Sequence, residues 1–221
     1  MCGRYALQGH PEKLAKHFKT ANWPTFPDRF NIAPTSEVPI IRLSPEGKRV
    51  VHLLKWGLVP HWSKDSAIGI KLTNARAESV ADKPSFQGAY KRRRCLIPAT
   101  GYYEWQTVPS ERKQPWFIHF KSGEPLAMGG IWESWTSTEG EILRTFSIIT
   151  TQANEVMAPI HDRMPLIISP EQWSRWLSPD VVEVAQLLEP YRSDAMEAWP
   201  VTRKVSNARE EGAELIIPDY P

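Results

Sequence analysis

The sequence predicts an α+β fold: a single domain, residues 1–221, with antiparallel β-sheets curled into a barrel-like core and flanked by short helices. Strand-like segments follow one another across short turns, and the segments with helical periodicity fall near the two ends of the chain. The 20 prolines are spread along the whole chain, which is typical of many short elements joined by stiff turns rather than of a helical bundle.

The first part of the chain predicts a helix and a hairpin. Residues 10–18 (HPEKLAKHF) space Leu14 and Phe18 for one face of a short amphipathic helix. Residues 38–43 (VPIIRL) and 49–57 (RVVHLLKWG) read as two strands joined by the turn SPEGK. These elements predict an antiparallel pair with a helix before it.

The second part of the chain repeats the strand-turn-strand pattern and closes with helices. Four strands are predicted, at 114–120, 126–132, 143–151 and 164–169. Two helices follow, at 170–177 and 181–188, and a closing strand is predicted at 213–218. The first two strands, with KSGEP between them, predict a second hairpin. The helix at 170–177 opens with a proline and spaces Trp173, Trp176 and Leu177 for one buried face.

Composition excludes several classes of protein. The apolar runs are far shorter than the roughly 18 residues of a membrane span, and the start of the chain lacks the apolar region of a signal peptide. Two cysteines, Cys2 and Cys95, make no disulfide framework, so we expect a cytoplasmic protein, nucleoid-associated if bacterial. No zinc-binding spacing occurs, and neither a metal nor a cofactor is implied. The net charge of +2 does not indicate nucleic acid by itself, and the basic run 91–94 (KRRR) reads equally as a solvated face.

The opening MCGRY places a cysteine directly after the initiator methionine. If Met1 is removed, Cys2 carries a thiol and a free α-amine on adjacent carbons, and an exposed pair has both groups partly in their nucleophilic forms at neutral pH. The amine forms an imine with an aldehyde, and the sulfur then closes a five-membered thiazolidine in an intramolecular step. The alternative is that Cys2 is a small apolar residue at a frayed terminus.

Three polar clusters lie at predicted turns or strand ends. LTNARAES contains Asn74, PATGYYEW contains Glu104 and APIHDRMP contains His161. Glu104 lies between aromatic residues, which predicts partial desolvation, a raised pKa and fitness for proton transfer. Taken one by one, each of the three residues has a purely structural alternative. Asn74 could form a turn, Glu104 could be a carboxylate at the surface, and His161 could be a structural histidine with its hydrogen bonds satisfied.

Taken in order, the motifs resemble one family. MCGRY, FNIAP, WGLVPHW, NARAES, CLIPATGYYEW, IHDRMP and the closing VSNAREEGAELIIP are similar to those of the SRAP family, the SOS-response-associated proteins that process abasic sites in DNA. The resemblance runs from Cys2 to about Pro218. It implies binding of single-stranded DNA and a covalent link to the aldehyde form of an abasic sugar.

The resemblance also implies roles for the four candidate catalytic residues. Cys2, after loss of Met1, is the cross-linking nucleophile, and Asn74 orients the sugar and the Cys2 terminus. Glu104 shuttles protons, and His161 assists proton transfer at the opened sugar. A Schiff base also permits β-elimination, so some lyase activity is expected, together with removal of the protein's own Met1.

The expected partner is single-stranded DNA containing abasic sites, including junctions with double-stranded DNA, bound by a monomer. The residues that the resemblance assigns to DNA contacts or to the wall of the site are Arg4, Asn31, Pro34, Trp62, Arg76 and Arg163. Arg4 and Arg76 suit phosphates, which would make binding fall with salt, and Trp62 suits base stacking. Unlike some family members, the chain has Ser63 after Trp62. A rigid turn remains the alternative for Asn31 and Pro34.

Two other functions remain open. MCG also opens the class II glutamine amidotransferases, in which an N-terminal cysteine attacks an amide, although the chain lacks their NGE-type and RGPD-type segments. A non-catalytic single-strand-binding module, in which Cys2 is incidental, is compatible with the tryptophans and the basic run.

Overall fold

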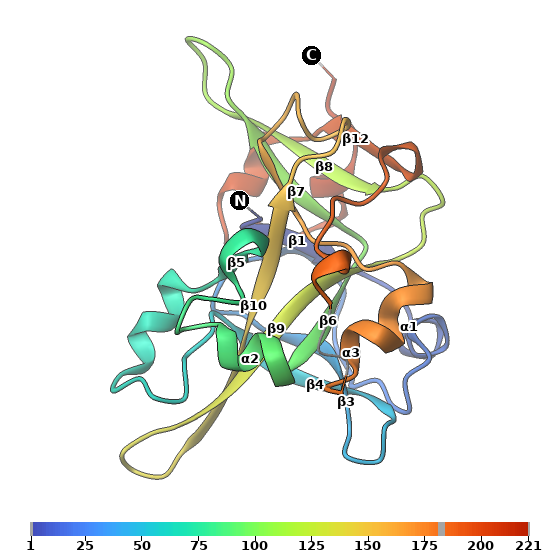
Figure 1. Cartoon of the computed structure of the whole chain (residues 1–221). Coiled ribbons are helices and arrows are strands. Elements are labelled where there is room, and N and C mark those ends of the chain that lie inside the picture. Colours follow the sequence, from blue (N-terminus) through green and yellow to red (C-terminus); the bar gives the residue numbers. More distant parts are fainter. Residues whose placement is uncertain (1, 181–183, 221) are drawn as a thin grey trace.

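The computed structural model describes residues 2–180 and 184–220 (Figure 1). Its centre is a closed ring of strands in the order β10-β4-β3-β6-β9, in which β9 pairs again with β10. We call this ring the barrel. Its strands are β3 (Glu37–Leu43), β4 (Arg49–Trp56), β6 (Arg94–Ala99), β9 (Leu126–Thr136) and β10 (Ile142–Gln152). The barrel-like core that the sequence predicts is therefore confirmed.

Ring closure requires a close approach of backbone at β9. A Cβ atom on Gly130 would lie 2.3 Å from Ile97 Cδ1 and 2.7 Å from the Ser147 carbonyl oxygen, both far inside normal contact. Only glycine allows the neighbouring strands to meet at this point.

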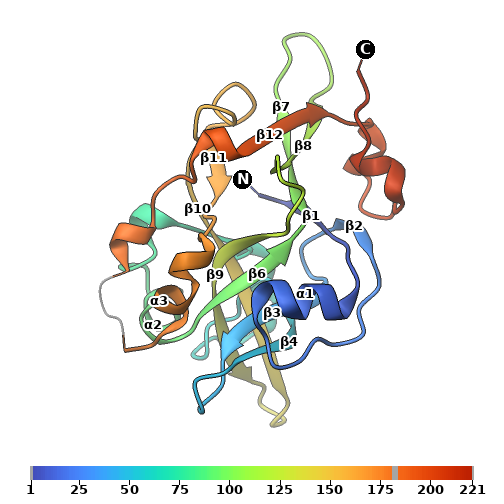
Figure 2. The ribbon, with the colours of Figure 1, turned by 90° about the vertical axis from the view of Figure 1, so that its right-hand side faces the viewer.

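A second sheet of five strands lies above the barrel (Figures 1 and 2). Its order is β12-β8-β7-β1-β2 and all of its pairs are antiparallel; the strands are β1 (Arg4–Leu7), β2 (Arg29–Ile32), β7 (Gly101–Gln106), β8 (Gln114–Phe120) and β12 (Met196–Pro200). The upper half of β10 extends beyond the ring and carries two short strands, β5 (Asn74–Arg76) and β11 (Arg163–Pro165).

The two sheets share one hydrophobic core. Tyr5 of β1 packs on Trp56 of β4, with ring centroids 5.4 Å apart, and Trp56 stacks on Phe146 of β10. A smaller apolar cluster, which includes Tyr103 and Val205, covers the opposite face of the five-stranded sheet. β1 is therefore covered on both faces, with Tyr5 and Leu7 toward the barrel and Ala6 toward the smaller cluster.

Short helices flank the sheets, as the sequence predicts. They are α1 (Pro11–Phe18), α2 (Gln87–Arg92) and α3 (Trp173–Leu177), with 3-10 turns at Ser66–Lys71, Ala77–Ser79, Pro170–Gln172, Ala185–Leu187, Ser193–Ala195, Arg203–Ser206 and Ala213–Ile216. The apolar faces of α1 and α3 meet, since Phe18 and Trp173 have ring centroids 5.2 Å apart. No helix within the described ranges has the length and apolar character to cross a membrane.

The structure corrects two predictions about strand pairing. β8 and β9 are not a hairpin, because residues 121–125 carry the chain from the upper sheet into the barrel. β4 and β5 each pair with β10 in parallel, so the sheets are not purely antiparallel. Both differences arise because the barrel closes through pairing of strands that are far apart in the sequence. Local turn patterns do not predict such pairing.

Three predicted elements are shorter or different. β11 ends at Pro165, and the following residues cross from β10 to β9, where Ile167 forms an isolated bridge with Met128. Residues 213–218 form a 3-10 turn and one bridge at Pro218 instead of a strand. In the predicted helix 181–188, residues 181–183 lie outside the described residues, and 185–187 form a 3-10 turn. The sequence also misses α2, which lies in the middle of the chain.

Arg94 supports the packing of α2 and α3 against β6. Its buried guanidinium donates hydrogen bonds to the carbonyl oxygens of Tyr90, Lys91, Trp176 and Ser178. We expect Arg94→Ala to lower the free energy of unfolding by about 3 kcal/mol, because four interior carbonyls lose their donor. The exposed Arg92→Ala serves as the control and should change it by less than about 0.5 kcal/mol. Urea unfolding measures both, and equal values would contradict this role for Arg94.

Candidate active site

Cys2 lies two residues before Arg4, the first residue of β1, and is completely buried. Its Sγ atom is 4.0 Å from the carbonyl oxygen of Arg4. Burial raises the pKa of the thiol well above its ordinary value, and the charge of Glu104 raises it further. The sequence argument, which expects an exposed and partly ionised thiol, is corrected here: the sulfur is protonated at neutral pH in this environment.

Asn74 connects the N-terminal strand to the barrel. Parallel pairing places Asn74 beside Ile148 of β10. From there its Nδ2 atom donates a hydrogen bond to the carbonyl oxygen of Cys2 at 2.9 Å. Its Oδ1 atom is buried and has no hydrogen-bond partner among the residues that the structure describes. Asn74 therefore fixes the backbone of Cys2 and leaves one acceptor next to it.

Glu104 projects from β7 into the space between the sheets and is 2% exposed. Burial raises its pKa to about 7. The predicted desolvation is confirmed, but its cause differs. Residues alternate along the strand, so Tyr103 and Trp105 lie with the smaller cluster on the far face, while Tyr102 shares the inner face with Glu104. The packing of the two sheets, rather than the adjacent aromatic residues, desolvates the carboxyl.

His161 approaches Glu104 from the turn before β11. Its Nε2 atom lies 4.0 Å from Glu104 Oε2. Its Nδ1 atom accepts a hydrogen bond from the backbone N–H of Arg163 at 2.9 Å and lies 2.8 Å from Asp162 Oδ1. Partial burial lowers the pKa of His161 below its ordinary value, so the ring is neutral at neutral pH. Nδ1 is therefore engaged by the Arg163 backbone and by Asp162, and Nε2 is the ring nitrogen that faces Glu104.

The loop that carries His161 is fixed from several sides. Gln106, two residues after Glu104 on β7, donates a hydrogen bond to the carbonyl oxygen of Pro159 at 3.0 Å. Asn154 accepts a hydrogen bond from the backbone N–H of Met157, and the Met157 carbonyl accepts one from His161 N–H. This scaffold holds the imidazole against the carboxyl of Glu104.

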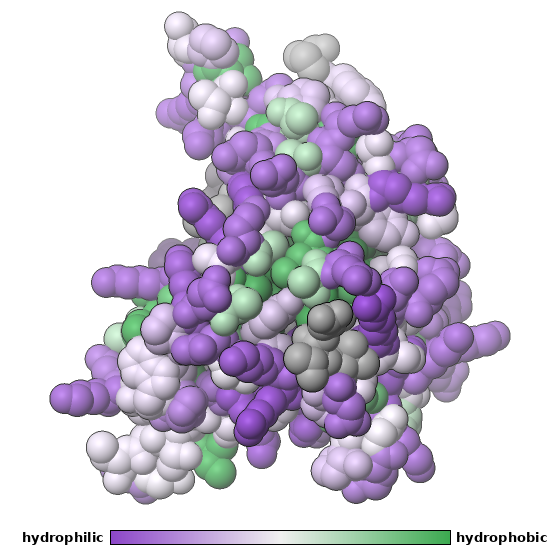
Figure 3. Space-filling view, viewed as in Figure 1, coloured by the Kyte–Doolittle hydropathy of each residue, from purple (hydrophilic) through white to green (hydrophobic). Residues whose placement is uncertain are grey.

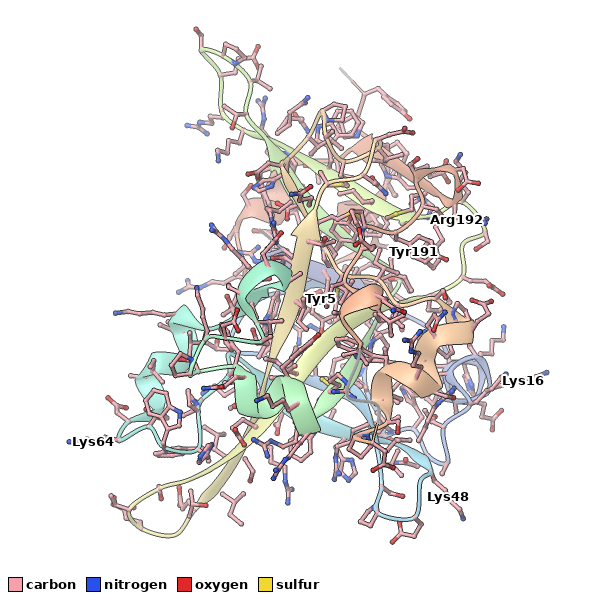
Figure 4. The ribbon with its side chains drawn as sticks, in the orientation of Figure 1. Tyr5, Lys16, Lys48, Lys64, Tyr191 and Arg192 are labelled. Atoms are coloured by element: carbon pink, nitrogen blue, oxygen red, sulfur yellow. The ribbon has the colours of Figure 1, made fainter. Side chains whose placement is uncertain are left out.

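Two tyrosines lie beside Cys2 that the sequence did not indicate as residues of the site. Tyr5 and Tyr102 are paired across β1 and β7, and both are completely buried. Burial raises the pKa of each phenol, and both hydroxyls lack a hydrogen-bond partner among the described residues. Figure 4 places Tyr5 near the centre of the molecule. The spacing of Tyr102 and Glu104, two residues apart on a strand, is the signal that could have placed them on one face.

The outer residues of the predicted interface divide into exposed and engaged groups. Arg76 and Trp62 are exposed, Trp62 by 52%, and are free to meet a ligand. Arg4 is half-buried, and its Nη1 atom donates to Asn31 Oδ1 at 3.1 Å and to the Val205 carbonyl at 2.7 Å. Arg4 therefore anchors the closing segment of the chain to β1.

Asn31, Pro34 and Arg163 occupy supporting positions. Asn31 is completely buried, and its Nδ2 atom donates to carbonyl oxygens in the closing segment. Pro34 lies in a tight turn before Thr35, whose φ is +74°. These positions favour the rigid-turn interpretation of FNIAP. Arg163 forms a bidentate ion pair with Glu78 at 2.5 and 3.0 Å, which occupies its guanidinium.

The structure thus brings Cys2, Asn74, Glu104 and His161 together from four separate segments, between the upper sheet and the barrel. Hydrophilic side chains cover most of the face shown in Figure 3. Within the described part of the chain, no group of three or more His, Cys, Asp or Glu residues could hold a metal ion. The chemistry available at the site is nucleophilic attack by Cys2 with proton transfer by a carboxyl and an imidazole.

This arrangement can be compared with known proteins. The family model described as SOS response associated peptidase (SRAP) matches residues 1–208. The chain belongs to the SRAP family. It is 38% identical over 222 residues to the abasic site processing protein YoqW of Bacillus subtilis, covering 98% of this chain and 99% of YoqW. It is 32% identical to the abasic site processing protein HMCES of Rattus norvegicus, covering 86% of this chain and 64% of that protein.

A solved structure shares the fold of this chain. A protein from Bacteroides thetaiotaomicron has 26% sequence identity and a TM-score of 0.89, with 99% of this chain and 100% of that chain covered. The family to which the sequence motifs point, and the α+β class, are therefore both shown.

The raised pKa of Glu104 predicts a pH dependence of stability. The pKa is about 7 in the folded protein, and about 4.3 is usual for an exposed glutamate. Between these values the folded state holds one more proton, so stability falls as pH rises, by up to about 1.4 kcal/mol per pH unit. This contribution is complete below the lower pKa and lost above the higher one.

We therefore expect Glu104→Gln to flatten the decline in stability between these two pKa values, measured by urea unfolding over a pH series. Glu78→Gln is the control, because the hydrogen bond from Arg163 holds the pKa of Glu78 below its ordinary value. An unchanged slope in Glu104→Gln would show that its carboxyl is ionised throughout.

Proposed function

We propose that this SRAP protein processes abasic sites in DNA by joining Cys2 covalently to the ring-opened abasic deoxyribose of single-stranded DNA. The observation that carries the proposal is the position of Cys2, whose carbonyl is held by Asn74 while Glu104 and His161 lie beside it. The names of the relatives, abasic site processing proteins, support DNA with abasic sites as the substrate.

The reaction needs two steps after Met1 has been removed. The α-amine of Cys2 adds to the aldehyde carbon of the opened sugar and water leaves, which gives an imine. The Cys2 sulfur then attacks the imine carbon, a C–S bond forms, and the thiol proton ends on the ring nitrogen of the thiazolidine. The second step is intramolecular, so a thiol that is mostly protonated can still react at a useful rate.

Glu104 and His161 are suited to move the protons in these steps. A carboxyl with a pKa of about 7 is present in both protonation states at neutral pH, so it can donate to the departing hydroxyl and accept from the thiol. His161, whose Nε2 atom faces Glu104, can exchange a hydrogen bond or a proton with the opened sugar or with the carboxyl. We assign Asn74 to positioning of the Cys2 terminus.

The same residues account for two side reactions within the proposal. The imine makes β-elimination possible, which would cut the strand on the 3′ side of the lesion. Hydrolysis of the Met1–Cys2 peptide by the protein itself would free the amine, with Glu104 as the acid–base group. For the DNA strand and its junctions, the exposed Arg76 and Trp62 supply a phosphate contact and a stacking surface.

A cross-linking experiment tests the role of Cys2. Purified protein is mixed with single-stranded DNA that carries one abasic site and is run on a denaturing gel. We expect a heat-stable covalent band that Cys2→Ala abolishes, because the ring needs the sulfur. Cys2→Ser should give only an imine that borohydride traps. Cys95→Ala, which removes the other buried thiol, is the control and should retain the band.

Other results would support the other functions. Glutamine hydrolysis without a covalent band would support an amidotransferase, and a native-gel shift without a denaturing band would support a passive binding module. A band that persists in Cys2→Ala would overturn the assignment of the nucleophile.

The role of Glu104 in proton transfer can be tested by kinetics. Glu104→Gln is expected to slow adduct formation by about 10²–10⁴-fold, the usual contribution of a general acid–base group, with nearly unchanged affinity for the same DNA. Time courses on denaturing gels and fluorescence anisotropy measure the two quantities. Equal losses of rate and affinity would mean that Glu104 is structural.

A further inference from the structure

The basic run 91–94 is divided by the fold. Arg94 is buried under α3, and Arg93 pairs with Glu133 at 2.6 Å. Lys91 and Arg92, at the end of α2, are exposed. Arg92 lies at a pocket of about 460 Å³, together with the turn between β3 and β4 and residues 177–180. The run therefore contributes one exposed guanidinium to a concave surface.

Arg42 of β3 forms another wall of this pocket. Its guanidinium lies over the ring of Trp132 of β9, 5.0 Å from the ring centroid. The stacking fixes the plane of the guanidinium and leaves its N–H edge available. The Nε atom of Arg42 is buried and has no hydrogen-bond partner among the described residues.

Two more basic groups reach the same end of the barrel. The half-buried His52 lies two residues before the buried Leu54 on β4, and the exposed Arg144 lies two residues before the buried Phe146 on β10. Both therefore lie on the same strand faces as core residues, at the end of the barrel. After partial burial, the charges of Arg42 and Arg144 lower the pKa of His52. The Nδ1 atom of His52 is buried and lacks a partner, like Arg42 Nε.

Carboxylates do not balance this charge. Among the described residues, Arg42, Arg92 and Arg144 form no ion pair, and Asp180 is the one carboxylate that lines the pocket. Partial burial lowers the pKa of Arg42, and the like charge of Arg144 lowers it further. Positive charge that is partly desolvated and left without a partner is costly unless an anion joins it.

We propose that the basic end of the barrel, formed by Arg42, His52, Arg92 and Arg144 around Trp132, binds a phosphate group. Guanidinium groups offer paired N–H donors that match phosphate oxygens, and the stacked Arg42 is already oriented for such contacts. The phosphate belongs either to the backbone of a nucleic acid strand or to a free nucleotide or polyphosphate. Both present the same oxygens to the site.

This site is separate from Cys2. In Figure 4 Lys48, in the turn between β3 and β4, marks the lower end of the barrel, and Tyr5 beside Cys2 lies well above it. The proposal therefore does not depend on the cross-linking function. A strand of DNA held at both places would have to pass along the outside of the barrel.

Nuclear magnetic resonance of the full chain tests the site directly. Inorganic pyrophosphate is titrated while the side-chain signals of Arg42 Nε–H and the His52 imidazole are followed. Phosphate binding should shift both signals and raise the pKa of His52, because an added anion stabilises the charged ring. The shift of the His52 signal should be lost in Arg42→Gln, and both shifts should be kept in Lys16→Gln, which changes an exposed lysine of α1 and serves as the matched charge control.

A second arm identifies the source of the phosphate. Binding of an intact single-stranded oligonucleotide is measured by anisotropy over a range of salt concentrations. If the site takes a DNA phosphate, Arg42→Gln should reduce the slope of log K against log salt by about 0.7, and Lys16→Gln should not. If it takes a free phosphate, pyrophosphate shifts the signals and the slope is unchanged. Signals that move with neither ligand, or equally in Arg42→Gln, would overturn the proposal.

Discussion

The hydrogen bond from Asn74 to the carbonyl of Cys2 joins the segment before β1 to β5, which pairs with the upper half of β10. It exists because β10 is longer than the ring requires, and its upper half pairs in parallel with β5. The five-stranded sheet packs over Cys2, and the side chain of Glu104 on β7 lies in the same space between the sheets. The candidate site is therefore a product of how the two sheets meet, and no single segment could form it alone.

The packing that brings the site residues together also keeps the thiol of Cys2 protonated. Burial raises the pKa of Cys2 and of Glu104, so at neutral pH the sulfur keeps its proton and the carboxyl is close to half-protonated. A buried thiol that keeps its proton is protected from oxidation and from electrophiles in solution. The neighbouring phenols of Tyr5 and Tyr102 add to this dry, polar setting without ionising.

The sequence predicted local elements well and long-range pairing poorly. Helix α1 and the β3–β4 hairpin follow from periodicity and a tight turn, which are local properties. The parallel pairing of β10 with β4 and β5 depends on residues far apart in the chain, so no short pattern reveals it. For the site, residue types and motif order indicated Cys2, Asn74, Glu104 and His161. Burial of the thiol and the pairing of Arg163 with Glu78 required the fold.

The alternation along β7 has a consequence for how such a chain can diverge. Glu104 faces the barrel and Tyr103 faces the smaller apolar cluster, one residue apart. Loss or gain of one residue between Gly101 and Glu104 would exchange the two faces of the strand. The carboxylate would then point into the smaller apolar cluster, and the phenol of the neighbouring tyrosine would point into the space between the two sheets. An insertion or deletion in the loop 107–113 does not change which face the residues of β7 point to. Related chains should therefore differ in length in this loop and not within β7.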